Sequence, residues 1–171
     1  MNDTRNVKGL AALQAALDSL PAKIEANIMR GALRAGAKVI ATAAKDNIAS
    51  HSGDLASSVR IGAKIDRAAG RVIGYVRAGG QKSAAFYAHM VEGGTQAHVI
   101  KAAPGSALAV GGGLYTQVQH PGARPHPFMR PALDSHAGAA VEASREYIRK
   151  RLAAKHGIDV PGPDDVDTAE A

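Results

Sequence analysis

The sequence of 171 residues contains no cysteine and no tryptophan, and its aromatic residues are limited to four tyrosines and two phenylalanines. The absence of cysteine excludes disulfide scaffolds, zinc–thiolate sites and cysteine nucleophiles. No apolar stretch approaches the roughly 20 residues that span a bilayer. The polar residues 1–8 also lack the apolar region of a signal peptide. We therefore expect no membrane-spanning helix and no contact with a membrane.

Small side chains take the place of the missing aromatic residues. The chain holds 36 alanines, within an apolar fraction of 46%. Aromatic side chains usually supply much of the area that a core buries. We therefore expect a thin core, completed by alanine-lined helix contacts or by neighbouring subunits.

The chain is also short of acidic residues, and those that it has are unevenly placed. It carries 21 Lys and Arg against 15 Asp and Glu, a formal net charge of +6. Five of the acids follow Gly157, so residues 1–157 hold 21 basic and 10 acidic side chains. This distribution predicts one basic domain over residues 1–157 and a disordered acidic tail over residues 158–171. An excess of positive charge favours anionic partners.

Apolar spacing near 3.6 residues predicts helices in the first and last thirds of the chain. The last helix has an apolar stripe that runs from Leu133 through Val141 to Leu152. The predicted helices cover residues 7–20, residues 21–48 and a segment from Pro127 or Phe128 to about Lys155, with a short helix or turn at 83–95.

Alternating polar and apolar residues predict strands in the middle of the chain. A hairpin joins residues 55–65 to 71–77 through the loop 66–70, and shorter strands follow at 98–101, 108–110 and 114–119. Glycine-rich segments at 79–82 and 104–113 are typical of loops that become ordered on a partner. The order of elements predicts an α+β fold with N-terminal helices, a small, mostly antiparallel sheet with long loops, and a long C-terminal helix packed on the sheet.

The candidate catalytic residues form no recognisable site. His89, Glu92, His98 and His120 lie within a short stretch, but no HExxH or similar zinc motif is present. Ser52, Ser57 and Ser58 lack a nucleophile elbow, and the glycines at 111–113 lack the Lys-Ser/Thr of a phosphate loop. We predict no catalytic residue, no metal and no cofactor, and therefore no enzymatic activity.

Basic residues recur on two predicted helices. Arg30, Arg34 and Lys38 stand at four-residue steps on one, and a second group lies on the last helix at Arg145, Arg149 and Arg151. Such groups either form a solvated helix face or contact an acidic partner or DNA phosphates without reading sequence. The pattern alone leaves both interpretations open.

Three ordered motifs carry more information than composition does. They are Ser52–Val59 (SGDLASSV), Tyr87–Thr95 (YAHMVEGGT) and His120–Leu133 (HPGARPHPFMRPAL). Gly53 permits a turn from helix to strand, and Leu55 starts the buried face. Tyr87, Val91 and Glu92 are predicted to pin a loop against the sheet. Pro127 and Phe128 are predicted to anchor the last helix, with Pro131 inside its first turn.

In this order and spacing, the motifs over residues 8–155 resemble the tail-completion, or head–tail joining, proteins of long-tailed (siphovirus-like) bacteriophages and prophages. That family typically shows T-G-x-L-x-x-S-I, Y-A-x-x-V-E-F-G-T and P-F-L-R-P-A-L. This chain departs from it with Ser52 for Thr, Gly93 for Phe and Met129 for Leu.

The resemblance implies a non-enzymatic virion protein, made in the host cytoplasm, that forms a homo-oligomeric ring in the phage neck. It would join the connector or stopper of the DNA-filled head to the tail terminator or tail tube, with non-specific contact to genomic DNA in the channel. Gly53, Leu55, Tyr87, Val91, Glu92, Pro127, Phe128 and Pro131 would then serve packing or interfaces. The alternative is a basic nucleic-acid-binding module that acts outside the virion.

Overall fold

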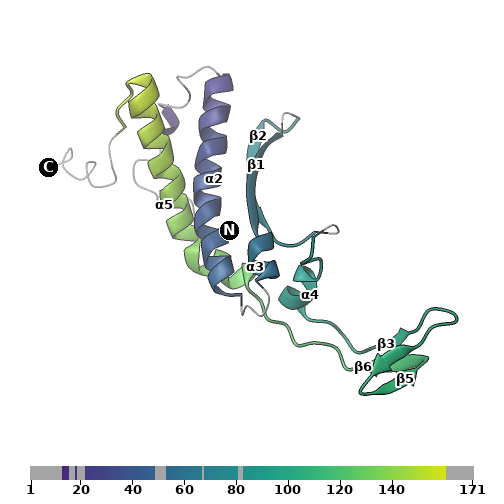
Figure 1. The fold of residues 1–171 in the computed structure, drawn as a ribbon. Coiled ribbons are helices and arrows are strands. Elements are labelled where there is room, and N and C mark those ends of the chain that lie inside the picture. The colour runs from purple at the N-terminus through teal and green to yellow at the C-terminus, as the bar shows by residue number, and fades with distance from the viewer. Residues whose placement is uncertain are drawn as a thin grey trace.

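The computed structural model describes residues 13–15, 18, 22–48, 53–66, 68–80 and 83–160. Two long helices, α2 (Ala22–Asp46) and α5 (Met129–His156), lie side by side and form the body together with the hairpin of β1 (Arg60–Asp66) and β2 (Arg71–Arg77) (Figure 1). The predicted α+β class is confirmed. Of the predicted helix over residues 7–20, residues 13–15 and 18 are helical, and the others lie outside the described residues.

Small residues bring α2 and α5 close together. A Cβ on Gly36 would overlap the Ser144 hydroxyl and lie 2.6 Å from the Ala140 carbonyl oxygen, and a Cβ on Gly31 would overlap the Tyr147 ring. Apolar side chains fill the contact between the N-terminal half of α2 and the C-terminal half of α5. The core cluster there comprises Leu13, Ile28, Ala32, Ile148, Leu152 and Val160. Glycine and alanine thus build this interface by letting the backbones approach.

The β1–β2 hairpin packs on α2, which lies between the hairpin and α5 (Figure 1). The two strands pair antiparallel from Arg60↔Arg77 to Asp66↔Arg71. The predicted packing of the last helix on the sheet is therefore wrong, because α5 packs mainly on α2. The contacts of Gly31 and Gly36 with α5 hold that helix against α2 instead.

The predicted strand over residues 55–65 begins later than expected. Gly53 is left-handed with φ 78°, and the short helix α3 (Asp54–Ser58) follows before β1. The Ser58 hydroxyl donates to the Leu55 carbonyl at 2.7 Å and accepts the Gly79 N–H at 2.9 Å. Leu55, Ser58 and Val59 are all buried. The four-residue spacing between Leu55 and Val59 suits a helical turn as well as it suits strand alternation.

The segment 83–95, predicted as a short helix or turn, contains both, because a series of turns leads into the short helix α4 (Ala88–Gly93). Beyond α4, four short strands form an arm that projects from the body (Figure 1). Strand β3 (His98–Lys101) pairs with β6 (Gln117–His120), and β4 (Leu108–Val110) pairs with β5 (Gly113–Tyr115), both antiparallel. The predicted strand over residues 114–119 is thus split at Thr116, because its two halves have different partners.

The body extends past the predicted domain boundary at Gly157. Gly157 is left-handed with φ 63°, as a helix stop requires. The Ile158 N–H then bonds the Leu152 carbonyl at 3.3 Å, and Val160 is 4% exposed. The predicted tail therefore begins three residues too early, since Val160 completes a core cluster. Residues 161–171 lie outside the described residues.

Candidate functional site: the joint, the arm and the groove

The three sequence motifs converge on one apolar cluster, which we call the joint. Leu55 comes from the first motif, Tyr87 and Val91 from the second, and Phe128 from the third. Phe128 is 2% exposed and is the largest buried side chain of this cluster. The motifs therefore define how α3, α4 and the start of α5 pack together.

Glu92 joins the second motif to the third through the N-terminus of α5. Its Oε2 accepts the N–H groups of Phe128 at 2.8 Å and Met129 at 2.9 Å, and its Oε1 accepts that of Arg130 at 3.1 Å. A helix leaves about four N–H groups without partners at its start. The fourth position here is Pro131, which has no N–H. One carboxylate thus satisfies every free donor of this helix end.

This environment changes the ionisation of Glu92. Partial burial raises the pKa of its carboxyl. The three backbone N–H groups and the charge of Arg130 lower this pKa by more than burial raises it, so the net pKa lies below the ordinary value. The positive end of the helix dipole favours the same charged state. Glu92 was predicted to pin a loop against the sheet, whereas the structure shows it capping α5.

Two more hydrogen bonds fix the joint. The His126 N–H donates to the Val91 carbonyl at 2.8 Å, and the Asn47 side-chain amide donates to the Phe128 carbonyl at 3.2 Å. Pro127 and Pro131 are exposed beside the anchored Phe128. The predicted anchoring of the last helix is carried by Phe128 and Glu92, while the prolines set the backbone path.

The arm, residues 95–123, starts and ends next to the joint. Thr95 and Ala123 exchange backbone hydrogen bonds of 2.9 and 3.1 Å, and the Thr95 hydroxyl also accepts the Ala123 N–H at 2.9 Å. Gly94 has φ 70°, and a Cβ there would lie 2.7 Å from the Ala123 carbonyl oxygen. Glycine is therefore required where the outgoing strand passes the returning one.

The arm has no core of its own. No residue from 95 to 127 is buried, and five large apolar side chains of the arm are between 38% and 77% exposed. Apolar residues occur on both faces, since the adjacent residues Val99 and Ile100 are both exposed. An isolated two-stranded ribbon is marginally stable in water. The exposed apolar residues are Val99, Ile100, Val110, Leu114 and Tyr115.

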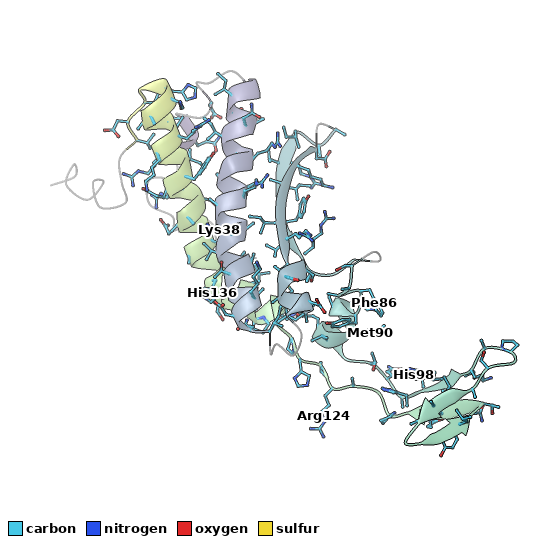
Figure 2. All side chains as sticks on the ribbon, viewed as in Figure 1. Lys38, Phe86, Met90, His98, Arg124 and His136 are labelled. Atoms are coloured by element: carbon cyan, nitrogen blue, oxygen red, sulfur yellow. The ribbon has the colours of Figure 1, made fainter. Side chains whose placement is uncertain are left out.

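The charge of the arm has one sign. No Asp or Glu occurs between Glu92 and Asp134, whereas Lys101 lies on the arm and Arg124 directly follows it. Figure 2 shows Arg124 extending into open space between the joint and the arm. Neither residue has an ion pair within the described part of the chain.

An open groove with a volume of about 720 Å³ runs along the body, with its walls formed by α2, β2 and α5. Its lining is mostly apolar and includes Leu33, Ile40 and Tyr75. Leu133 and Val141, which were predicted to lie in the packed stripe of the last helix, also line it and are 51% and 50% exposed. The buried face of α5 is rotated away from them, towards Ala132, Ala140, Arg145, Ile148 and Leu152.

The predicted basic contacts are only partly on the surface. Arg30, Arg34 and Lys38 are exposed along α2, and Arg151 is exposed on α5. Arg145 is 6% exposed, so the subunit does not offer it to a partner as predicted. Arg149 is half-buried and donates from Nε to the Val160 carbonyl at 3.1 Å. The stripe on α2 is therefore the stronger basic surface.

The candidate metal residues do not gather. Among the described residues, no three His, Asp or Glu side chains are placed to hold a metal ion. His89 bonds the Phe86 carbonyl at 3.2 Å, while His98 and His120 face one another across the arm with ring centroids 5.0 Å apart. Ser57 and Ser58 bond carbonyls of their own helix α3, and Ser52 lies outside the described residues. No helix in the described chain is long and apolar enough to cross a membrane.

Two features of the site were not predicted from the sequence. The groove depends on the rotation of α5, which its residue pattern leaves open. The capping role of Glu92 has a sequence signal, because Glu92 is the sole acidic residue between Asp66 and Asp134. The helix that it caps also begins without a Ser, Thr, Asp or Asn at the N-cap, where Phe128 stands.

Comparison with known proteins gives one family. Residues 11–94 match the HK97-gp10-like family model, described as "Bacteriophage HK97-gp10, putative tail-component". The match spans α2, the hairpin and α4, and it ends where the arm begins. Searches of curated proteins and of solved structures gave no significant match. The match covers just under half of the chain. It makes residues 11–94 similar to a phage tail-component family, in agreement with the resemblance carried by the first two motifs.

Proposed function

We propose that this chain is a non-enzymatic structural protein of the phage neck, a ring-forming adaptor that joins the DNA-filled head to the tail. The matched family of phage tail components supports a structural role in the virion. The finer assignment to the head–tail junction draws on the three motifs that meet in the joint. Its neighbours would be a head-side connector or stopper and a tail terminator or tail tube protein.

The arm is the observation that carries this proposal. A 29-residue segment without a single buried residue, but with five large apolar side chains in water, is built for contact with another chain. Its unpaired strand edges can also accept a strand. The described part of the body, by contrast, contains two core clusters of its own. Such a subunit can fold first and bury its arm on assembly.

Particle assembly tests the proposal directly. Deletion of the coding sequence in the phage should leave filled heads and finished tails that do not join, and expression of the intact chain should restore joined particles. Antibody labelling of restored particles should place the chain at the neck. Infectious particles that form without the chain, or purified virions that lack it, would overturn the assignment.

The exposed stripe of Arg30, Arg34 and Lys38 favours a second candidate, non-specific binding of nucleic acid. Phosphate contacts release counterions, so affinity should fall steeply as salt rises. Binding of duplex DNA by the purified chain, measured from about 50 to 200 mM salt, tests it. Loss of binding when Arg30, Arg34 and Lys38 are all replaced by glutamine would support a phosphate-binding surface. Unchanged binding by that variant, or no binding by the wild type at low salt, would exclude it.

A further inference from the structure

We infer that the arm of one subunit seats in the apolar groove of a second copy of this chain, and that this contact joins neighbours in the ring. The inference rests on the proposed function, because it names the surfaces that would close the ring. It commits to a second copy as the occupant of the groove. Head and tail proteins, or other parts of the same chain, would be different occupants.

The groove and the arm have matching surfaces. The groove presents half-exposed Leu133 and Val141 beside Leu33 and Ile40. Its volume of about 720 Å³ falls within the roughly 300–1,000 Å³ of pockets that enclose ligands. The arm presents branched aliphatic side chains, of which Leu114 at 77% is the most exposed. Burial of one surface against the other would remove both from water.

Charge favours the same pairing. Asp134 lines the groove, is exposed, and has no ion pair to another described residue. The arm has no acidic residue, and it carries Lys101 with Arg124 at its root. Glu92 also lines the groove, but its carboxylate already binds the start of α5 and is offset by Arg130. Arg130 lines the groove too and balances Glu92, so Asp134 is the uncompensated charge of the lining, and its sign is complementary to that of the acid-free cationic arm.

The arm of the same subunit does not fill this groove. It leaves the base of the body at α4 and extends away from α2 and the hairpin (Figure 1). The Thr95–Ala123 bridge holds both of its roots next to the joint. Two different surfaces of one chain that meet between copies form a heterologous contact, and such contacts close into rings when the rotation allows.

Cross-linking between differently tagged subunits tests the contact, and the absence of native cysteine makes each introduced thiol unique. Subunits carrying L114C in the arm should cross-link through a bismaleimide to separate subunits carrying L133C in the groove. The matched control is H136C, an exposed residue of α5 that does not line the groove. Equal cross-linking to L133C and H136C would overturn the inference.

Charge reversal provides a second measurement by equilibrium sedimentation. Asp134→Lys should weaken self-association by at least about tenfold, as expected when a complementary charge becomes a repulsive one. Asp46→Lys makes the same charge change at the exposed end of α2, outside the groove, and should leave association unchanged. Equal effects of the two substitutions would contradict a specific role for the groove.

Accessibility of the groove identifies its occupant. L133C should be protected from maleimide in the oligomer, and it should react freely when residues 98–120 are replaced by a short glycine–serine turn. Protection that depends instead on residues 161–171, or that requires an added head or tail protein, would assign the groove to that occupant and overturn the inference. Full reactivity in the oligomer would also overturn it.

The outcomes separate this inference from the proposed function. Rings that persist in the variant without the arm would overturn the arm–groove contact and leave the neck assignment intact. A chain that cross-links as expected but is missing from virions would retain the contact and lose the neck assignment.

Discussion

The body and the arm of this protein show two ways of using apolar residues. In the body, Phe128 and Leu152 are almost fully buried, and short side chains bring α2 against α5. In the arm, large apolar residues stay exposed to water on two small two-stranded ribbons, β3–β6 and β4–β5. The contrast shows that large apolar residues serve two purposes in this chain, because those of the body fill its core clusters and those of the arm remain exposed.

The largest effect should come from the anchor of the joint. Phe128→Ala is expected to lower the free energy of unfolding by about 3–5 kcal/mol, because it leaves a cavity in the cluster that holds α3, α4 and α5 together. Chemical denaturation followed by circular dichroism measures it. The control is Phe86→Ala, since Phe86 is 57% exposed and lies near the root of the arm (Figure 2). Comparable losses in the two variants would contradict the assignment of Phe128 as the anchor.

The next effect concerns the close approach of the helices. Gly36→Val places a side chain against the Ala140 carbonyl and Ser144, and should destabilise the body by about 1–3 kcal/mol through overpacking. Gly138 on α5 has open space around it, so Gly138→Ala should stabilise the helix by up to about 1 kcal/mol. Thermal unfolding of both variants checks the opposite signs. A stable Gly36→Val variant would show that the helices can separate without cost.

A smaller effect is expected at the helix cap. Glu92→Gln should cost about 0.5–2 kcal/mol at neutral pH, as the loss of a capping group does. Because the folded pKa of Glu92 is lowered, its ionised form stabilises the fold above the ordinary pKa of about 4.3, and that contribution disappears as pH falls through the folded value. The difference between wild type and variant in urea unfolding should therefore shrink on acidification. A difference that is constant with pH would argue against the charged cap.

The smallest effect on folding belongs to the arm. Leu114→Ser should change the stability of the monomer by less than about 0.5 kcal/mol, because a residue so exposed loses no packing. The same substitution should weaken self-association if the arm seats in a neighbour. Sedimentation and unfolding measured on one sample separate the two effects. A clear loss of monomer stability would mean that the arm packs on its own body after all.

The sequence predicted most elements of the fold, for reasons that particular residues make clear. Four-residue spacing marked α2, and the turn around Gly70 marked the hairpin. The arm strands followed from short apolar runs between glycines. The α3 turn was missed because Leu55 and Val59, four residues apart, fit both the helical and the strand period. The rotation of α5 was missed because Leu133 and Val141 continue its apolar stripe. Tertiary contacts with Gly31 and Gly36 of α2 decide which face of α5 is buried.

The sequence identified many residues of the candidate site, but it did not predict how these residues contact one another. Leu55, Tyr87, Val91 and Phe128 were singled out and do meet in one cluster. The burial of Arg145 was missed, because a charged residue on a helix gives no sign of the face on which it lies. The capping contact of Glu92 spans 36 residues of sequence, and only the folded chain shows it.

The way the arm is rooted has a mechanical consequence. Its two strands leave the body side by side, tied by the Thr95–Ala123 bridge. One strand continues into Glu92 and the other into Phe128, and these two residues are hydrogen-bonded to each other. Tension applied along the arm is therefore shared between the two strands and passes into the long axis of α5 through the carboxylate at its start. A force on the arm of one subunit would therefore be transmitted along the full length of α5.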